Sequence, residues 1–305
     1  MPSEQRGSSQ AFIESVVTAL KDATDEPLAP GLYLVSTPIG NLTDISLRAL
    51  AVLHGVDIVY CEDTRHSRKI LQRYGIRKSL QTYHDHSDEK LRGKIIQQLD
   101  KSLSVALISD AGTPLISDPG FKLVREVQNS GYDVTCIPGA TSVIAALTIS
   151  GLPTDRFYFE GFLPTRLSDR QKKLEALVDL RTSLIFFESP SRLVRTLEAI
   201  RGVLGDRDCA VVREITKKFE EVLRGSLSEL VSGCDERKVK GELVIVVAGA
   251  EAKIPDQEDI KKWLRQAMQT QSLRDAAKEI SRQHDLPRNK VYELGLQLKQ
   301  EEEEI

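Results

Sequence analysis

Short apolar segments alternate with helical patterns over residues 32–138. Four of these segments are apolar almost throughout and rich in strand-forming residues: LYLVST, VDIVYCED, SVALISD and DVTCIP. The stretches between them carry apolar residues at helical spacing and predict helices at about 45–53, 66–74, 88–99 and 119–129. Strands that are apolar on both faces and separated by helices are typical of a parallel sheet covered on both sides. We therefore expect an α/β domain over residues 31–150.

A second set of strand-like segments follows: RFYFEGF, TSLIFFES, DCAVVRE, EEVLRGS and ELVIVVAG. Helical patterns lie at about 169–179, 191–204 and 226–236. The short spacing between AVVRE, VLRGS and LVIVV indicates antiparallel pairs and hence a mixed sheet. These features predict a second α/β domain over residues 151–250, with the segment GLPTDR at 151–156 as the hinge.

Both ends of the chain have a different pattern. Residues 1–30 form a polar extension with one short amphipathic helix, whose apolar positions are Phe12, Ile13, Val16, Val17 and Leu20. Residues 251–305 have few strand formers and indicate a helix, a short turn and a second helix, which is the helix-turn-helix spacing. The expected small core of this module is Ala277, Ile280, Leu286, Val291 and Leu294. Packing on the body and contact with nucleic acid both remain open for it, because its charge is nearly balanced and Glu301 to Glu304 would repel phosphate.

Composition and charge narrow the function classes. The chain has 305 residues, 40% of them hydrophobic, 29% charged, with a net charge of −3, so any nucleic-acid contact must come from a local patch. The four cysteines, Cys61, Cys136, Cys209 and Cys234, lack the paired spacing of a zinc or redox site, and three lie in strand-like segments where a reduced thiol packs as a small hydrophobe. The sequence has neither an export signal nor about 18 uninterrupted apolar residues, which predicts a cytoplasmic protein.

Candidate chemistry lies at the carboxyl ends of the predicted strands, where loops of a parallel sheet converge on ligands. These loops are STPIGN, CEDTRHS, SDAGTPLISDPG and PGATS. None carries a glycine-rich phosphate-binding fingerprint. Thr43 or Asp44 is expected to cap the helix after the first loop. Ser117 or Asp118 should cap the helix after the third, with Pro119 in its first turn.

Two charged clusters invite other interpretations. His66, His84 and His86, with Asp85 and Asp88, suggest a metal, but YHDHSDE follows no known ligand pattern and a polar loop is the better interpretation. The second domain places charged side chains at or next to strand ends: Glu160, Glu188, Arg192, Arg213, Glu214, Lys217 and Glu242. Glu188 and Arg192 are four residues apart and close enough to pair in a helical turn, so a structural ion pair and a substrate role are both open.

Taken together, these loops resemble the tetrapyrrole methylase family. The segments TPIGNLTDIS, EDTRHSRKIL, SDAGTPLISDPG, PGATSVIAALTISGLPTDRF, EGFLP, FFESPSRL and GELVIVV stand in that family's order and spacing from about residue 31 to residue 250. The resemblance is strongest to a branch that modifies ribosomal RNA, and the C-terminal helices resemble the extra domain of that branch. It implies a homodimer whose two α/β domains enclose S-adenosylmethionine, and methyl transfer to the ribose 2′-hydroxyl of a cytidine in the decoding region of 16S ribosomal RNA.

The resemblance also implies roles for particular residues. The expected cofactor-binding residues are Pro38, Asp110, Ala111, Gly112, Thr113, Pro114, Gly139, Thr141, Ser142, Phe187 and Glu242. Gly112 would let the backbone approach the ligand and Pro114 would fix the turn. Asp63 and Glu188 are the candidates for assisting the attacking hydroxyl. Candidates for holding RNA phosphates are Arg65, Arg68, Arg192, Arg213 and Lys217.

Two rival functions fit parts of the pattern. A tetrapyrrole methyltransferase of cobalamin or sirohaem synthesis, acting on precorrin or uroporphyrinogen, would share the fold and the cofactor. A non-catalytic RNA-binding assembly factor could have kept the fold without the chemistry. The helical module and the charged segment EDTRHSRK favour RNA over a porphyrinoid.

Overall fold

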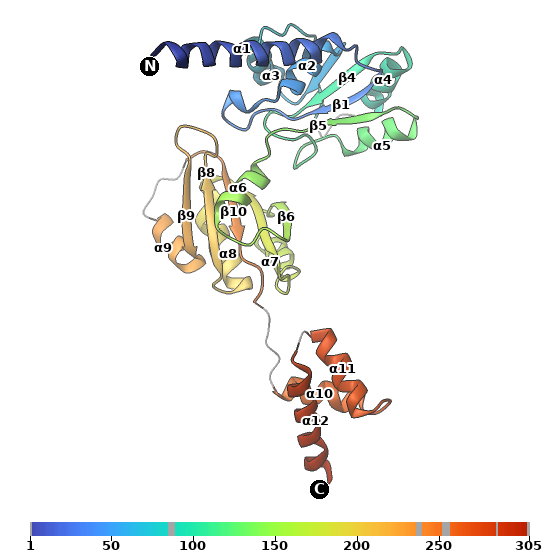
Figure 1. Ribbon diagram of the computed structural model, residues 1–305, viewed down its shortest axis with the longest axis vertical. Helices are drawn as coiled ribbons and strands as arrows, with labels where there is room; N and C mark the ends of the chain where they lie inside the picture. Colours follow the sequence, from blue (N-terminus) through green and yellow to red (C-terminus); the bar gives the residue numbers. More distant parts are fainter. Residues whose placement is uncertain (1, 85–88, 236–239, 252–256, 285, 304–305) are drawn as a thin grey trace. The chain divides into compact units, whose positions relative to one another are not determined.

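The computed structural model describes residues 2–84, 89–235, 240–251, 257–284 and 286–303 (Figure 1). The chain divides into two compact units, Met1–Ala250 and Glu251–Ile305. Both predicted sheets lie in the first unit, and the helical module is the second. Asp85, His86 and Asp88, which belong to the possible metal cluster noted in the sequence, lie outside the described residues.

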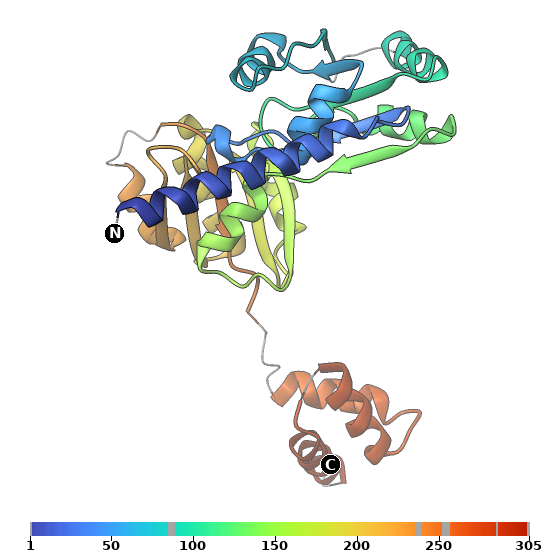
Figure 2. The same ribbon diagram turned by 45° about the horizontal axis from the view of Figure 1, so that its top comes forward.

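The first sheet is parallel throughout, as predicted, with strand order β3-β2-β4-β1-β5. Its strands are β1 (Gly31–Val35), β2 (Ile58–Cys61), β3 (Leu80–Thr82), β4 (Ser104–Ile108) and β5 (Val134–Ile137). Helices α2 (Leu47–Gly55) and α3 (Thr64–Arg73) pack on one face through a core that includes Leu53 and Leu71. Helices α4 (Glu89–Asp100) and α5 (Phe121–Asn129) cover the other face through Ile95 and Leu123 (Figure 2).

The second sheet is mixed, which confirms the prediction from strand spacing. Its order is β6-β7-β10-β8-β9, and only the β6–β7 pair is parallel. The strands are β6 (Phe157–Phe162), β7 (Ser183–Glu188), β8 (Asp208–Arg213), β9 (Glu221–Ser226) and β10 (Leu243–Val247). Helices α7 (Leu167–Glu175), α8 (Leu193–Leu204) and α9 (Leu227–Asp235) cover one face.

Helix α6 (Ser142–Ser150) covers the opposite face of the second sheet and is absent from the sequence-based prediction. Its Val143, Ala146 and Leu147 pack against Ile185 and Val212 of that sheet. The sequence-based boundary at residue 150 assigns this segment to the first domain, whereas its packing places it with the second sheet. The chain therefore crosses between the sheets at residues 138–141, before the predicted hinge.

Two predicted helix caps are wrong. The hydroxyl of Ser46, rather than Thr43 or Asp44, caps α2 by accepting a hydrogen bond from the amide of Ala49 at 3.1 Å. Helix α5 begins after Gly120, whose φ of 137° no ordinary side chain favours, and no side chain caps it. Pro119 therefore precedes the helix. Ser117 and Asp118 line a cavity instead of capping the helix.

The remaining helices lie at the ends of the chain. Helix α1 (Pro2–Asp25) is longer than predicted, packs along α2, and exposes Phe12, Ile13 and Val17 to solvent. The second unit consists of α10 (Gln257–Ala267), α11 (Leu273–His284) and α12 (Arg288–Glu303). Its core contains the predicted Ala277, Ile280, Val291 and Leu294, with Leu286 partly buried beside them.

Three further sequence-based expectations concern cysteines, membranes and metals. Cys61 and Cys209 are buried in strands, but Cys136 is exposed because β5 is an edge strand; the side chain of Cys234 is not described. No helix among the described residues has the length and apolar character needed to cross a bilayer. Nor do the described His, Cys, Asp and Glu side chains form a group of three or more able to hold a metal ion.

Candidate functional site

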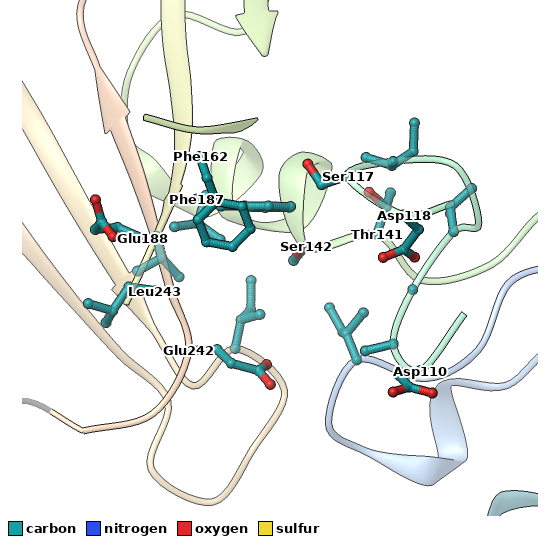
Figure 3. A pocket seen from close by; sticks show the side chains of 18 residues that line it. Asp110, Ser117, Asp118, Thr141, Ser142, Phe162, Phe187, Glu188, Glu242 and Leu243 are labelled. Atoms are coloured by element: carbon teal, nitrogen blue, oxygen red, sulfur yellow. The ribbon is translucent and has the colours of Figure 1, made fainter. Parts of the chain in front are cut away.

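A cavity of about 290 Å³ lies where the loops of the first sheet meet the second sheet (Figure 3). The loop after β4 and the start of α6 form one wall, and strands β7, β8 and β10 form the other. The lining residues are Ile39, Asp110, Ala111, Gly112, Thr113, Ile116, Ser117, Asp118, Thr141, Ser142, Phe162, Phe187, Glu188, Val212, Ile215, Glu242, Leu243 and Val244.

The segment Asp110–Thr113 is fixed to the end of β1. Thr37 and Gly112 exchange two backbone hydrogen bonds, of 2.9 and 3.1 Å. The hydroxyls of Ser36 and Thr113 lie 3.1 Å apart, and Thr113 also donates to the carbonyl oxygen of Ala140. Gly112 has a φ of +83°, and a Cβ there would lie 3.2 Å from Ile39, so the predicted need for glycine has a clear physical cause. Hydrogen bonds therefore hold this wall in place, and Gly112 allows its backbone to pack closely against Ile39.

The segment Leu115–Asp118 continues the same wall through an unusual backbone. Leu115 and Ser117 have φ values of 73° and 61°, in the left-handed region that side chains other than glycine seldom adopt. The loop passes close to the bulge in β6, since a Cβ on Gly161 would lie 3.2 Å from the Ser117 hydroxyl. Ile116, Ser117 and Asp118 thereby line the cavity, whereas the sequence pattern predicts only helix initiation for Ser117 and Asp118. Strain of this kind is concentrated at functional sites.

Helix α6 begins at the cavity. Thr141 is its N-cap residue and Ser142 its first residue, and both line the cavity, but no side chain caps the helix. The amide groups of a helix's first turn lack partners inside the helix. Together with the helix dipole they favour a negatively charged group at this point of the cavity.

The opposite wall is largely apolar. Val212, Ile215, Leu243 and Val244 line it, and the ring of Phe187 points into the cavity between them and the loop after β4 (Figure 3). Phe187 is held edge-on by Phe159 and Phe162, with ring centroids 4.9 and 5.5 Å away. This wall offers flat apolar surface of the kind that an aromatic ring system packs against.

An ion network lies beside the cavity and includes its lining residue Glu242. The Lys217 ammonium donates to Glu214 at 2.9 Å and to Glu242 at 3.1 Å, and the Glu242 amide donates to Glu214 at 3.0 Å. The hydrogen bond from Lys217, followed by that from the Glu242 amide, lowers the pKa of Glu214. Burial alone would lower the pKa of Lys217, but its two carboxylate partners outweigh burial and raise it.

The β8–β9 loop, which carries Glu214 and Lys217, contacts the turn after β1. The hydroxyl of Thr216 accepts a hydrogen bond from the Asn41 amide at 3.1 Å. A Cβ on Gly40 would lie 2.5 Å from the Lys217 side chain, so only glycine allows this approach. The β8–β9 loop therefore joins the two halves of the site.

The charge of the cavity is one-sided. Among the described residues that line it, four are acidic, Asp110, Asp118, Glu188 and Glu242, and none is Lys, Arg or His. Glu242 is paired with Lys217 and Glu188 with Arg192, so Asp110 and Asp118, on the loop after β4, are the carboxylates that make the cavity favour a cation over a phosphate.

Asp63, a candidate base, serves as a helix cap instead. Its carboxylate accepts a hydrogen bond of 2.7 Å from the Arg65 amide at the start of α3 and pairs with the Arg65 side chain at 3.4 Å. The backbone hydrogen bond, followed by that from the side chain, lowers the pKa of Asp63. A lower pKa makes a weaker base, and Asp63 does not line the cavity. Its amide donates to Asp110 at 3.1 Å, which ties α3 to the cavity wall.

Glu188, the other candidate base, lines the cavity but directs its carboxylate away from it. Side chains alternate along β7, so the Phe187 ring enters the cavity while the Glu188 carboxylate lies on the other side of the strand (Figure 3). The carboxylate is buried and accepts hydrogen bonds from Thr196 at 2.6 Å and from the Ser189 amide at 2.8 Å. It also pairs with Arg192 at 3.2 Å, as the four-residue spacing predicted. These contacts favour the structural interpretation.

The five cations proposed for RNA fall into two groups, and none lines the cavity. Arg192, Arg213 and Lys217 are engaged inside the protein: Arg192 with Glu188 and the carbonyl oxygen of Leu163, Arg213 with Glu221, and Lys217 as described above. Arg65 and Arg68 are exposed on α3. Only these two are therefore placed to meet a large ligand from solvent.

Most of the predicted cofactor-binding residues come together in the cavity: Asp110, Ala111, Gly112, Thr113, Thr141, Ser142, Phe187 and Glu242. Pro38, Pro114 and Gly139 do not line it. Gly139 instead allows close packing, because a Cβ there would lie 2.8 Å from Ser36.

Comparison with known proteins agrees with this geometry. The model of the tetrapyrrole (corrin/porphyrin) methylases matches residues 31–231. The chain belongs to that family. A second model, the RsmI C-terminal HTH domain, matches residues 254–299.

Particular relatives point the same way. The chain is 47% identical over 275 residues to "Ribosomal RNA small subunit methyltransferase I" of Mesorhizobium japonicum, covering 90% of this chain and 94% of the relative. Among solved structures, a cobalt precorrin-4 methyltransferase of cobalamin biosynthesis superposes with a TM-score of 0.55 at 17% identity, covering 71% of this chain and 94% of that one. The uroporphyrin-III C-methyltransferase of Thermus thermophilus, solved with S-adenyl homocysteine, gives 0.50 at 21% identity, covering 71% and 96%. At these identities the two structures show the fold.

Proposed function

We propose that this protein is an S-adenosylmethionine-dependent methyltransferase that modifies the RNA of the small ribosomal subunit, at the ribose 2′-hydroxyl of cytidine 1402 of 16S RNA. The observation that supports S-adenosylmethionine as the cofactor is the charge of the cavity. Among the described lining residues none is a cation, and Asp110 and Asp118 place two carboxylates on the loop that faces the apolar wall. S-Adenosylmethionine is phosphate-free and carries sulfonium and ammonium charges, so it fits where a nucleotide polyphosphate would be repelled.

In this proposal the two walls of the cavity contact different parts of the cofactor. We expect Asp110 and the backbone of Ala111 to Thr113 to face the positively charged methionine part. The uncapped start of α6, at Thr141 and Ser142, suits its carboxylate. Val212, Val244 and Phe187 provide the apolar surface for the adenine ring. When bound, the cofactor supplies an electrophilic methyl group on a good leaving group.

The chain's own part in the reaction is alignment and exclusion of water. Transfer makes a bond between the ribose oxygen and the methyl carbon, breaks the bond between carbon and sulfur, and releases the hydroxyl proton. Holding the two reactants in line accounts for a large part of the rate. Neither Asp63 nor Glu188 presents a free carboxylate to the cavity, so alignment by the loop Leu115–Asp118 and by Phe187 has the larger share in this proposal.

The relatives and the second unit support RNA as the substrate. The name of the relative that aligns over 90% of this chain includes ribosomal RNA. The helix-turn-helix domain model matches residues 254–299. The fold alone is equally compatible with tetrapyrrole methylation, since the superposed structures include such enzymes. An absorbance shift on mixing with a precorrin-like compound would favour that alternative.

The decisive experiment is mass mapping of 16S RNA treated with the purified protein and S-adenosylmethionine. We expect one added methyl group at the cytidine named above, resistant to alkaline cleavage because the 2′-oxygen is blocked. Calorimetry with the cofactor addresses the non-catalytic alternative, because a protein that does not bind the cofactor cannot be a methyltransferase of this kind. Methylation elsewhere in the RNA would overturn the site and leave the enzyme class intact.

We further propose a cytoplasmic homodimer, as the family resemblance implies. The exposed apolar side chains of Phe12, Ile13 and Val17 on α1, 45–69% accessible, support association, because such side chains gain from being covered. Sedimentation equilibrium of the full chain tests the proposal, and a monomer at micromolar concentration contradicts it.

A further inference from the structure

One segment of the chain is strongly basic although the whole molecule is not. Residues 64–84 contain six Lys or Arg and no Asp or Glu, whereas the net charge of the chain is −3. The segment consists of α3, the turn after it and β3. A local excess of positive charge is the electrostatic signature of a nucleic-acid contact.

Helix α3 presents this charge on its solvent side. Ser67, Ile70 and Leu71 are its buried residues. Arg65, Arg68, Lys69 and Arg73 are exposed, and so is Arg77 in the following turn. We call these five residues the basic face. Arg65 and Arg73 are about 12 Å apart along the helix axis, a span that meets more than one phosphate of an extended strand.

The basic face is largely unneutralised. Arg65 pairs with Asp63, at a position where the arginine side chain is 86% accessible. Across the part of the chain that the structure describes, no ion pair is formed by Arg68, Lys69, Arg73 or Arg77. Other cations behave differently: Arg92 pairs with Glu126 at 2.6 Å. Apart from Arg65, the basic face therefore carries charge that none of the acidic side chains in the described ranges neutralises.

The basic face begins at the rim of the cavity. Asp63, the N-cap of α3, donates its amide proton to Asp110, and Asp110 lines the cavity. Only Thr64 lies between Asp63, which contacts the cavity wall, and Arg65, the first cation of the basic face. A strand whose ribose enters the cavity has its neighbouring phosphates beside this helix.

We infer that the basic face is the docking surface for the phosphate backbone of the RNA substrate next to the nucleotide that is methylated. This inference rests on the proposed function, and it assigns the binding of phosphates to α3 rather than to the cations near the cavity or to the second unit. Over residues 257–303 nine Lys or Arg are balanced by nine Asp or Glu. That balance provides no net attraction for phosphate.

The test compares two full-length variants with the same loss of charge. The first removes four cations of the basic face: Arg68→Gln, Lys69→Gln, Arg73→Gln and Arg77→Gln. Arg65 is kept because it contacts the helix cap. The matched control removes four exposed lysines elsewhere in the first unit: Lys90→Gln, Lys101→Gln, Lys122→Gln and Lys172→Gln. Affinity for a 16S RNA fragment is measured at several salt concentrations, and cofactor affinity by calorimetry.

We expect the first variant to bind RNA about 10²-fold more weakly at 0.15 M salt, with its salt dependence shallower by about 3, since each lost phosphate contact on single-stranded RNA contributes about 0.7 to the slope. Its cofactor affinity should match wild type, and saturating RNA should restore turnover. RNA affinity equal to that of the control variant overturns the inference.

Two other results separate this inference from the proposed function. If wild type binds RNA but methylates none, the proposed function fails and the docking surface can still be judged from affinity. If the first variant binds and methylates naked RNA normally but fails on assembled small subunits, the basic face meets an acidic ribosomal protein, and RNA docking is wrong.

Discussion

At the scale of single residues, side-chain direction decides which candidates belong to the site. Phe187 and Glu188 are neighbours at the end of β7, but only the first enters the cavity. The sequence correctly predicts that polar residues gather at this edge of the sheet. It cannot say which way each one points, because that depends on strand register and on how partners such as Thr196 of the following helix α8 pack against the strand.

Replacing Glu188 tests its structural role. Glu188→Gln keeps the size but removes the charge that pairs with Arg192 and accepts from Thr196. We expect the free energy of unfolding to fall by about 1–3 kcal/mol. Turnover at saturating substrate and the pH profile of single-turnover methylation should stay as in wild type. Loss of the rising limb of that profile, with stability unchanged, would instead identify Glu188 as the base.

Replacing Gly112 tests the backbone wall. Gly112→Ala places a Cβ 3.2 Å from Ile39 at a φ of +83°. We expect a loss of about 1–2 kcal/mol in unfolding free energy, since side chains disfavour this conformation. Cofactor affinity should fall roughly tenfold if the wall shifts by a comparable energy.

A matched control for Gly112 lies in α8. Gly202 has no heavy atom within 4 Å of the added Cβ, so Gly202→Ala should stabilise the protein by about 0.5–1 kcal/mol. Chemical denaturation and calorimetry measure both variants. Equal effects of the two substitutions would show that the conformation of Gly112 is unimportant.

At the scale of elements, the long-range pattern was more informative than local detail. Nine strands and the parallel or mixed character of each sheet follow from apolar runs and their spacing. Helix α6 was missed because VIAALTIS is apolar on all sides, so it shows no amphipathic period, and β3 because it has three residues. The sequence predicts helix capping for Ser117 and Asp118 because the left-handed backbone at Leu115 and Ser117 leaves no signal in residue type.

The cap of α3 separates a structural from a catalytic Asp63. Asp63→Asn keeps an oxygen that accepts from the Arg65 amide, whereas Asp63→Ala removes it. We expect Asp63→Asn to retain near-wild-type single-turnover methylation and thermal stability, and Asp63→Ala to lower the melting temperature. A large rate loss in Asp63→Asn with an unchanged melting temperature would restore Asp63 as the base.

The β8–β9 loop gives a pH-dependent prediction through Glu214. Its pKa is lowered in the folded protein by Lys217 and then by the Glu242 amide. The stabilisation is therefore fully present above the unfolded pKa of about 4.3 and is lost as pH falls through the lowered folded value. We expect Glu214→Gln to be less stable than wild type by about 1 kcal/mol between pH 5 and 8.

The comparison of the two proteins across pH provides the check. The difference in unfolding free energy should shrink as pH falls below the unfolded pKa of about 4.3 and close only below the lowered folded pKa, where Glu214 is protonated and as neutral as glutamine. Denaturant titrations at a series of pH values measure it. A difference that persists unchanged to pH 3 would mean that Glu214 acts through packing and not through its charge.

At the scale of the whole molecule, the chain joins two units with separate cores. The core of the second unit contains residues of α10–α12, and the first unit ends with the Ala250 amide donating to Leu180 at 2.7 Å. All residues of the cavity and of the basic face lie in the first unit. Cofactor binding and phosphate contact should therefore be properties of residues 1–250, and any discrimination among RNA sequences is left to the second unit.

Ending the chain after Ala250 tests this division. We expect the shortened protein to fold cooperatively, to bind S-adenosylmethionine within about twofold of the full chain, and to keep most of its salt-dependent RNA affinity, because a twofold change is only about 0.4 kcal/mol. Its preference for the 16S fragment over an unrelated RNA of equal length should fall if the helix-turn-helix unit reads RNA. A tenfold loss of cofactor affinity would contradict the division, because it would require the second unit to complete the site.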